Sequence, residues 1–355
     1  MDRKIKVTID ACLPQMVTAE TIYNSYGAVI VWENTVLDDL LIARLKDFGI
    51  DIIRVFESSL PQNIKSQQPN IQIKSKEVQF SESYEKDTEE FKSILHDLSV
   101  GKTVSIEKTI KIADSVYSKK EQNSEIIKCI SQIRSVDEYT YYHCINVSML
   151  SMLLGKWLKF YPEDIHLLVQ AGLLHDVGKS RIPVSVINKP EKLTDEEYTE
   201  MKKHSEYGYY LVQYMDGIDR RVLEAILYHH EREDGSGYPL GLHGEQIPVF
   251  AKILAVTDIF DAMTANRSYK NMDSPFHVFD LMQNGCFGYL DPIVLNTFLS
   301  NISHYYVGNK VKISDGRIAE VIYINSQQYG KPVLKAGEKY IDMSIEKKVK
   351  IEQLI

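Results

Sequence analysis

The sequence predicts a mainly α-helical protein with a small α/β module at its N-terminus and a small β module at its C-terminus. Three patterns support this fold class. Residues from about 136 to 304 repeat apolar side chains at the three- and four-residue spacing of amphipathic helices. Before residue 58, short apolar runs alternate with one helical pattern, and after residue 307 strand–turn–strand patterns follow one another. A chain of 355 residues is long enough for two or three domains.

The composition is that of an ordinary soluble protein, with 44% hydrophobic and 25% charged residues. The net charge of −8 argues against a broad surface for large nucleic acids, but it leaves room for a small anion held by local cations. The four cysteines form no CxxC pair, so neither a disulfide framework nor a cysteine zinc site is expected. No apolar run approaches the ~20 residues of a membrane span, and the N-terminus does not resemble a secretion signal. We therefore expect a cytoplasmic protein.

The N-terminal module is predicted to cover residues 1–58. Residues 4–9, 27–32 and 50–56 have the short apolar pattern of strands. Residues 37–48 carry apolar side chains at helical spacing, and the following glycine is a typical helix stop. This module contains no nucleotide-binding loop or catalytic cluster, so the sequence does not predict its role.

A polar segment rich in Gln, Asn, Ser and Pro, at residues 59–80, is predicted to be a linker. Residues 81–134 follow as a helical connector that breaks at Gly101 and leads into the helical domain, placed at residues 105–305. Residues 306–355 form the predicted β module, interpreted as an appendage that packs on the helical domain.

Five helical segments of the central region each place a histidine or an aspartate on the apolar face. One helix carries His143 among Val147 and Leu150, and another, opened by Pro162, ends in the pair His175–Asp176. A third is expected from Thr194, which forms a capping-box pattern with Glu197, to about Met215, and a fourth begins at about Asp219. Any one of these residues alone could be a hydrogen-bonded core group or a polar helix end. Together, so many buried titratable groups are expected only where cations hold them. The set is His143, His175, Asp176, His204, His229, His230 and Asp258.

Seven ligand side chains exceed the three or four protein ligands of one zinc ion, so we predict two metal ions that share a bridging carboxylate. Asp176 is the expected bridge because it directly follows His175. Nitrogen and oxygen ligands without thiolate suit iron, manganese or zinc, and the residue types do not separate these metals.

Two long motifs, LLHDVGK at residues 173–179 and HHEREDGSGYPLGL at residues 229–242, resemble those of the HD-GYP family of bacterial cyclic dinucleotide phosphodiesterases. This family is a branch of the HD metal-dependent phosphohydrolases, and the resemblance covers about residues 105–305. It implies an HD-type helical bundle with two or three metal ions, usually iron or manganese. It also implies hydrolysis of cyclic di-GMP to pGpG, GMP or both. The family's ligand positions fall on the same seven residues.

The resemblance assigns further roles. Lys179 and Asp176 would be catalytic, and Arg267 and Lys270 would contact phosphate. Members with three metals have a glutamate where this chain has Tyr139, so the resemblance implies two. The family's proline after the arginine is replaced by Ser268, which puts the loop geometry in question. The implied substrate-binding residues are Gly237, Tyr238, Pro239, Asp261, Arg267 and Lys270.

Alternative functions remain open at this point. The same residues could bind a cyclic dinucleotide without turnover and signal through the N-terminal module or a protein partner. They could hydrolyse another cyclic dinucleotide or a nucleoside phosphate, or form a di-iron oxygenase. The helices of residues 81–134 could also pair with a second copy of the chain as a homodimer.

Overall fold

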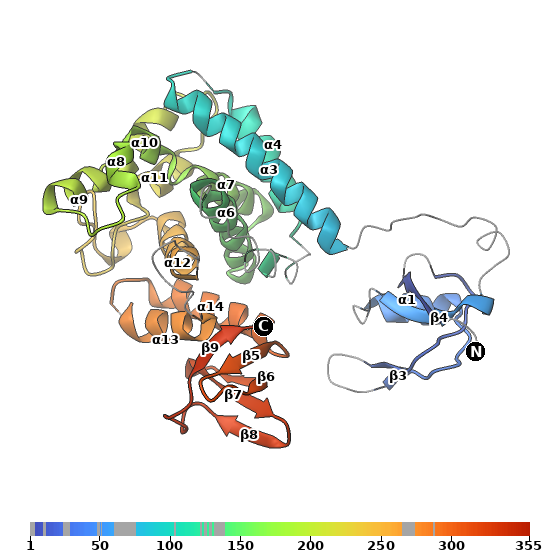
Figure 1. Ribbon diagram of the computed structural model, residues 1–355. Helices are drawn as coiled ribbons and strands as arrows, with labels where there is room; N and C mark the ends of the chain where they lie inside the picture. Colours follow the sequence, from blue (N-terminus) through green and yellow to red (C-terminus); the bar gives the residue numbers. More distant parts are fainter. Residues whose placement is uncertain are drawn as a thin grey trace. The chain divides into compact units, whose positions relative to one another are not determined.

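The computed structural model describes residues 4–9, 12–23, 29–47, 50, 52–59, 76–102, 104–120, 123, 126–127, 130, 139–264, 274–286 and 288–355. The chain divides into two compact units, Met1–Lys74 and Ser75–Ile355 (Figure 1). Arg267, Ser268 and Lys270 lie outside the described residues, as does most of the predicted linker.

The first unit is a small α/β module, as predicted. Strand β1 (Lys4–Thr8) pairs antiparallel with β4 (Ile52–Phe56), and the short β2 (Ile22–Tyr23) pairs with β3 (Val29–Val31). Helix α1 (Asp39–Asp47) follows the buried Leu37 and contributes the buried Leu45 to the core. Strand β2 was not predicted, because only two of its residues are paired and so short a run carries no alternation.

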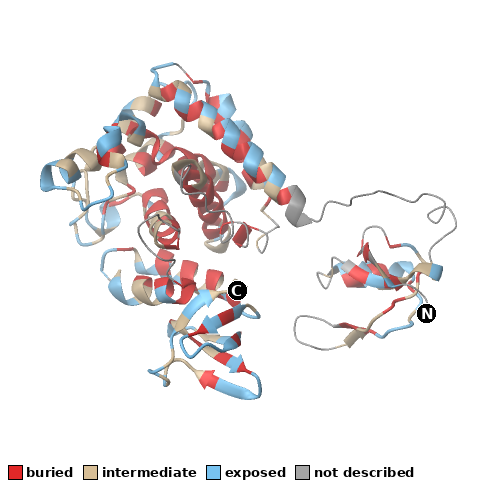
Figure 2. Cartoon of the chain, viewed as in Figure 1, coloured by how far each residue is buried: buried red, intermediate tan, exposed pale blue. Residues whose placement is uncertain are grey.

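The second unit is a helical bundle that carries a small sheet. Its helices and 3₁₀ turns are, in chain order, α3 (Lys76–Ser99), α4 (Ile106–Ser118), α6 (Tyr139–Trp157), α7 (Pro162–Leu174), η3 (Val177–Arg181), α8 (Val184–Ile187), α9 (Asp195–Lys202), α10 (His204–Val212), α11 (Arg220–Tyr228), η4 (Gly244–Gln246), α12 (Val249–Thr264), α13 (Pro275–Gly285), α14 (Pro292–Ile302) and η5 (Ser303–Tyr306). Most of α6 and much of α7 and α12 are buried (red in Figure 2), so these three helices form the centre of the bundle.

A close contact between α6 and α7 places two of the predicted ligands side by side. A Cβ atom on Gly172 would lie 2.6 Å from the Cα atom of Ser148, so only glycine allows this approach of the two helices. His143 lies one turn before Ser148 on α6, and His175 follows the end of α7. Their ring centroids are 5.2 Å apart as a result.

Two predicted boundaries are wrong. Residues 76–80, assigned to the linker, are the first residues of α3, which begins early because Phe80 and Tyr84 bury their rings against the bundle. The single helix expected from Thr194 to about Met215 is divided at Lys203 into α9 and α10. The predicted capping box of Thr194 is present, but the ring of His204 turns back to the carbonyl oxygen of Met201 at the division.

The C-terminal residues form one antiparallel sheet in the order β8-β7-β6-β5-β9. Gly330 of β7 lies so close to α13 that a Cβ atom there would be 2.5 Å from the Phe276 carbonyl oxygen. Strand β9 was not predicted, because its alternation is weak and it pairs only with β5 at the sheet edge. The strands are β5 (Lys310–Ile313), β6 (Ile318–Asn325), β7 (Gln328–Ala336), β8 (Lys339–Asp342) and β9 (Ile351–Leu354).

In the part of the chain that the structure describes, no helix combines the length and apolar character needed to cross a membrane.

Candidate metal centre

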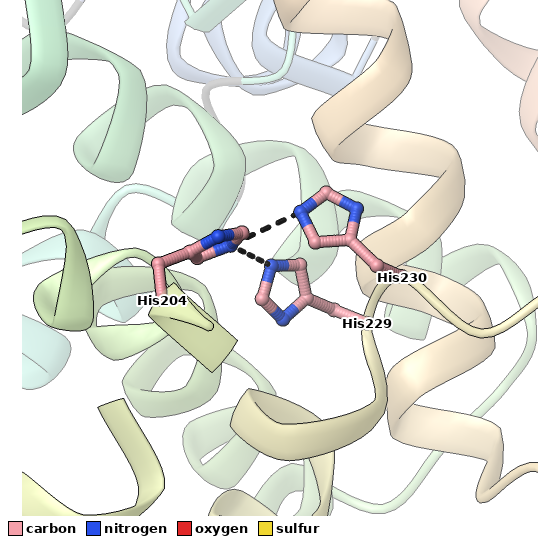
Figure 3. A group of neighbouring side chains, drawn as sticks. All are labelled: His204, His229 and His230. Carbon is pink, nitrogen blue, oxygen red and sulfur yellow. Dashed lines mark hydrogen bonds between the residues drawn. The ribbon is translucent and has the colours of Figure 1, made fainter. Parts of the chain in front are cut away.

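Six of the seven predicted ligands gather into two groups among the described residues. In each group, one possible ligand atom per residue lies within 4.8 Å of the others. The His143 group consists of His143 on α6, His175 at the end of α7 and Asp258 on α12; the His204 group consists of His204, His229 and His230. The three rings of the His204 group point toward one another from the start of α10 and the end of α11 (Figure 3).

Asp176, the seventh predicted ligand, lies between the two groups. Its Oδ2 atom is 3.5 Å from Nε2 of His143 and 3.4 Å from Nε2 of His175. Its other oxygen, Oδ1, is 3.4 Å from Nε2 of His204. One carboxylate therefore faces both groups, which is the geometry that a bridging ligand requires.

The outer nitrogen of four histidines is fixed by a hydrogen bond. Three of them donate from Nδ1 to a backbone carbonyl oxygen over 2.7–2.8 Å. His175 donates to Gly172, His204 to Met201 and His229 to Ile226. In His143, Nδ1 donates to Oδ2 of Asp261 over 2.7 Å. Because a carbonyl or carboxylate oxygen can only accept, the hydrogen lies on Nδ1 and the lone pair on Nε2 faces inward.

Because these lone pairs face inward, each group is suited to bind a cation. Nε2 of His204 lies 3.3 Å from that of His229 and 3.1 Å from that of His230. Burial lowers the pKa of His204, and burial together with the neighbouring His230 holds the pKa of His229 well below its usual value, so both rings are neutral. Two buried atoms, Nε2 of His175 and Oδ1 of Asp176, have no hydrogen-bond partner. A divalent metal ion would accept these converging lone pairs, for which the described residues supply no donor.

Lys179 and Asp176 form a contact at the edge of the two groups. The Lys179 ammonium donates to Oδ2 of Asp176, and its side chain is 28% exposed, so one side of it can meet a ligand. Burial would raise the pKa of Asp176, but Lys179 and His175 outweigh it and hold that pKa well below its usual range. Burial likewise opposes the charge of Lys179, yet Asp176 and Asp258 raise its pKa. Both groups therefore carry their charges.

Asp261 occupies a different place from the one predicted. The resemblance implied that Asp261 binds substrate, but the residue is buried behind His143. Its Oδ2 accepts a hydrogen bond from Nδ1 of His143, and its Oδ1 accepts one from Nδ2 of Asn146 over 2.9 Å. Both oxygens are thus engaged by protein groups on α6. We reassign Asp261 as the residue that orients His143, since the face of α12 that carries it is turned toward α6.

Two glycines of the motifs have steric roles. A Cβ atom on Gly178 would lie 1.9 Å from the carbonyl oxygen of His204 and 2.4 Å from the amide nitrogen of Gly208, so the segment after Asp176 packs directly on the backbone of α10. A Cβ atom on Gly237 would lie 2.6 Å from the carbonyl oxygen of His230. Each glycine thus lets the backbone pack directly against the backbone of a predicted ligand, His204 or His230.

The loop at residues 231–242 covers one side of the centre. The ring of Tyr238 lies 4.7 Å from that of His230, centroid to centroid, and its peptide bond to Pro239 is cis. Glu231 is buried and holds the loop from beneath, accepting from the amide of Leu240 over 2.7 Å and that of Leu242 over 2.9 Å. A pocket of about 500 Å³ opens beside this loop. It is lined by residues that include Tyr198, His229, His230, Arg232, Tyr238, Asp258 and Tyr289.

Comparison with known proteins agrees with this geometry. The family model described as "HD domain" matches residues 110–294, more than half of the chain. The chain belongs to the HD domain family. The resemblance found in the sequence is thereby confirmed, and with it the mainly α fold with a small C-terminal sheet. Phosphohydrolases of this family depend on metals, and the His143 and His204 groups are the candidate binding clusters.

Relatives of this HD domain chain include two curated phosphodiesterases. It is 31% identical over 263 residues to a cyclic di-GMP phosphodiesterase of Pseudomonas aeruginosa, covering 74% of this chain and 62% of the relative. It is 36% identical over 171 residues to the 3′3′-cGAMP-specific phosphodiesterase 1 of Vibrio cholerae, covering 48% of this chain and 39% of the relative. The chain therefore spans less than two thirds of the length of either.

A solved structure has a similar fold. It is an HDG"Y"P protein from Bdellovibrio bacteriovorus, which aligns with a TM-score of 0.54 over 83% of this chain and 98% of its own. The sequence identity is 16%, so the similarity concerns the fold alone.

Three residues of the HD domain site were missed by reasoning from the sequence. Asn146 bonds to a residue 115 positions away, and Glu231 bonds to amides 9 and 11 positions away in a loop, so helical spacing indicates neither contact. Arg232, whose guanidinium lies 5.2 Å from the centroid of the Tyr289 ring at the pocket, looks in the sequence like any exposed charge. The helical spacing of α11 ends at Tyr228, and beyond it periodicity no longer predicts which side chains are buried.

We expect Glu231→Ala to loosen the loop without removing the ligands. The change deletes both acceptors for the Leu240 and Leu242 amides and should lower the free energy of unfolding by about 1–3 kcal/mol. Denaturant unfolding and metal content measure the two effects separately. Glu245→Ala, at an exposed position of η4, is the matched control. A loss of metal without a loss of stability would show that Glu231 acts on the ligands and not on the loop.

Proposed function

We propose that the chain is a metal-dependent phosphodiesterase that hydrolyses cyclic di-GMP to pGpG, GMP or both. The observation that carries this proposal is the place of Asp176, whose two oxygens face two separate groups of inward lone pairs. Such an arrangement suits two divalent ions, with His143, His175 and Asp258 around one and His204, His229 and His230 around the other. When bound, two such ions lower the pKa of water and neutralise negative charge on a phosphate.

The metals are proposed to be iron or manganese, in keeping with the resemblance, and zinc also suits nitrogen and oxygen donors. The seven side chains include five imidazoles and two carboxylates and no thiolate. Cys144, next to His143 in the chain, is fully buried and is not among either group. A soft, thiolate-preferring metal is therefore not expected here.

The protein groups beside the ligands have roles of their own. Lys179 would place its ammonium against a non-bridging phosphate oxygen while Asp176 keeps it charged. Tyr238 and Tyr198 would bound the pocket and exclude water from one side of the substrate. Arg267 and Lys270, which lie outside the described residues, stay predicted as contacts for the second phosphate.

The substrate class follows from the relatives and from the pocket. The Pseudomonas relative supports cyclic di-GMP, whereas the Vibrio relative favours 3′3′-cGAMP as a second candidate. A pocket of about 500 Å³ beside the ligands can admit at least one nucleotide unit of either. The cytoplasmic location and a homodimer or protein partner, both expected from the sequence, stay predictions.

The test is a substrate panel. Protein loaded separately with Fe²⁺ or Mn²⁺ is incubated with cyclic di-GMP, 3′3′-cGAMP and linear pGpG, and products are separated by chromatography. We expect cyclic di-GMP to be hydrolysed to pGpG or GMP. Faster hydrolysis of 3′3′-cGAMP would transfer the assignment to the second candidate. Tight binding of cyclic di-GMP without any product, with both metals, would favour a non-catalytic sensor.

A further inference from the structure

A chain of buried hydrogen bonds leads from the metal centre to α3, the first helix of the second unit. The Tyr84 hydroxyl on α3 donates to Oδ1 of Asn146 over 2.6 Å, and Nδ2 of Asn146 donates to Oδ1 of Asp261 over 2.9 Å. The other oxygen of Asp261 accepts from Nδ1 of His143 over 2.7 Å. The first two bonds are donated in the direction of Asp261, and the third is donated to Asp261 by His143, so Asp261 accepts from both sides.

The four residues are almost completely buried, with exposed fractions of 0% for Tyr84, 5% for Asn146, 3% for Asp261 and 2% for His143. Buried hydrogen bonds of this kind are strong, and a partner left without its bond is destabilised. Removing the first bond would therefore affect the next one along the chain.

Packing alone does not account for the hydroxyl of Tyr84. Its ring stacks on that of Tyr142 at a centroid distance of 5.9 Å and an interplanar angle of 9°, and on Phe80 at 6.4 Å. A phenylalanine ring could make the same two contacts. What only tyrosine supplies is the donor to Asn146.

The side-chain amide of Asn146 makes the coupling directional. Its oxygen accepts from Tyr84, so its nitrogen must face Asp261. The reverse orientation would place two acceptor oxygens against each other. Asp261, which can only accept, sets this orientation of the amide, and the Tyr84 hydroxyl donates to the amide oxygen and holds it there. His143, bonded to Asp261, directs its Nε2 toward Asp258, 3.0 Å away.

We propose that Tyr84 is a positioning residue for the metal ligand His143, so that the packing of α3 on α6 sets the geometry of the His143 group. The proposal rests on the metal centre of the proposed function. It gives α3 a role beyond that of a connector, because a displacement of α3 along α6 would lengthen the 2.6 Å bond between Tyr84 and Asn146.

The test compares Mn²⁺ binding by the metal-free 355-residue chain and by its Tyr84→Phe variant, using titration calorimetry. We expect two binding events in the unchanged protein. Partners bonded directly to a ligand typically contribute about 10–100-fold to metal affinity, and Tyr84 lies two bonds further out, so one event should weaken by about 3–10-fold. The other event should keep its affinity. Tyr117→Phe on α4, where the hydroxyl accepts from Lys120 over 3.2 Å, removes the same atom elsewhere and should change neither event.

A double variant tests whether Tyr84 and Asn146 act through the same series of hydrogen bonds or independently. Asn146→Ala breaks the hydrogen-bond chain nearer to the ligand, so its loss should be larger than that of Tyr84→Phe, but below the roughly 100-fold upper limit for partners bonded directly to a ligand. Adding Tyr84→Phe to it should cause no further loss, because the link between Tyr84 and Asp261 is already gone.

The proposal is overturned if Tyr84→Phe keeps both Mn²⁺ affinities while its unfolding midpoint falls, or if the two losses multiply in the double variant. The readout needs no substrate. Two bound Mn²⁺ ions without hydrolysis of any cyclic dinucleotide would therefore defeat the proposed function and leave this proposal standing. A protein that binds no Mn²⁺ would defeat both.

Discussion

Asp176→Ala should abolish metal loading and phosphodiesterase activity together. The two oxygens of Asp176 face the His143 group and the His204 group, within 3.4–3.5 Å of Nε2 atoms in both. Without it, each group keeps three possible ligands, but the negative charge shared between two cations is lost. We expect metal affinity to fall by more than the roughly 100-fold upper limit typical of residues that only support a ligand.

Metal content by mass spectrometry and hydrolysis of cyclic di-GMP measure the two losses on the same sample. Asp176→Asn is the closest variant in shape and should behave like the alanine variant, because an amide cannot bridge two cations with two anionic oxygens. Asp315→Ala serves as the matched control, since Asp315 pairs with Arg317 in the C-terminal sheet. If Asp176→Ala retains two metal ions per chain, Asp176 is not the bridge.

Gly178→Ala should be strongly destabilising. Its Cβ atom would lie 1.9 Å from the His204 carbonyl oxygen and 2.4 Å from the Gly208 amide nitrogen, and both are backbone atoms that cannot turn aside. The segment that carries Asp176 must therefore move away from α10. Overpacking typically costs about 1–3 kcal/mol, and a clash between two backbones should lie at or above the upper end.

The same displacement should weaken metal binding, because His204 begins α10 and its ligand atom faces Asp176. Thermal unfolding of the metal-free protein gives the stability change, and Mn²⁺ titration gives the change in affinity. Gly285→Ala on α13, where a Cβ atom meets nothing within 4 Å, is the control for stability and should be neutral or slightly stabilising. An unchanged unfolding midpoint for Gly178→Ala would contradict the close packing of η3 on α10.

The inward direction of the predicted ligands could be inferred from the sequence, because helical periodicity assigns a residue to a face without knowledge of its partners. His143, His204 and Asp258 lie where their apolar neighbours along each helix point. The capping box at Thr194 and the helix beginning at Asp219 are likewise local features, and both are present.

The features that could not be predicted from the sequence depend on which helices pack against one another. The bond that Asn146 donates to Asp261 depends on the packing of α12 on α6. The resemblance assigned Asp261 to substrate, whereas in the structure it bonds to Asn146 and to the predicted ligand His143. Tyr84 lies 62 positions before Asn146, and no spacing rule connects them. The helix is divided at Lys203, directly before the part of α10 against which Gly178 packs, and helical periodicity does not reveal that contact.

The central claim is a two-metal centre divided by Asp176. Anomalous diffraction from crystals of the protein loaded with Mn²⁺ or, without oxygen, with Fe²⁺ tests it most directly. We predict two peaks, one among His143, His175 and Asp258 and the other among His204, His229 and His230, with Asp176 contacting both. A single peak, or two peaks of which only one contacts Asp176, would contradict it.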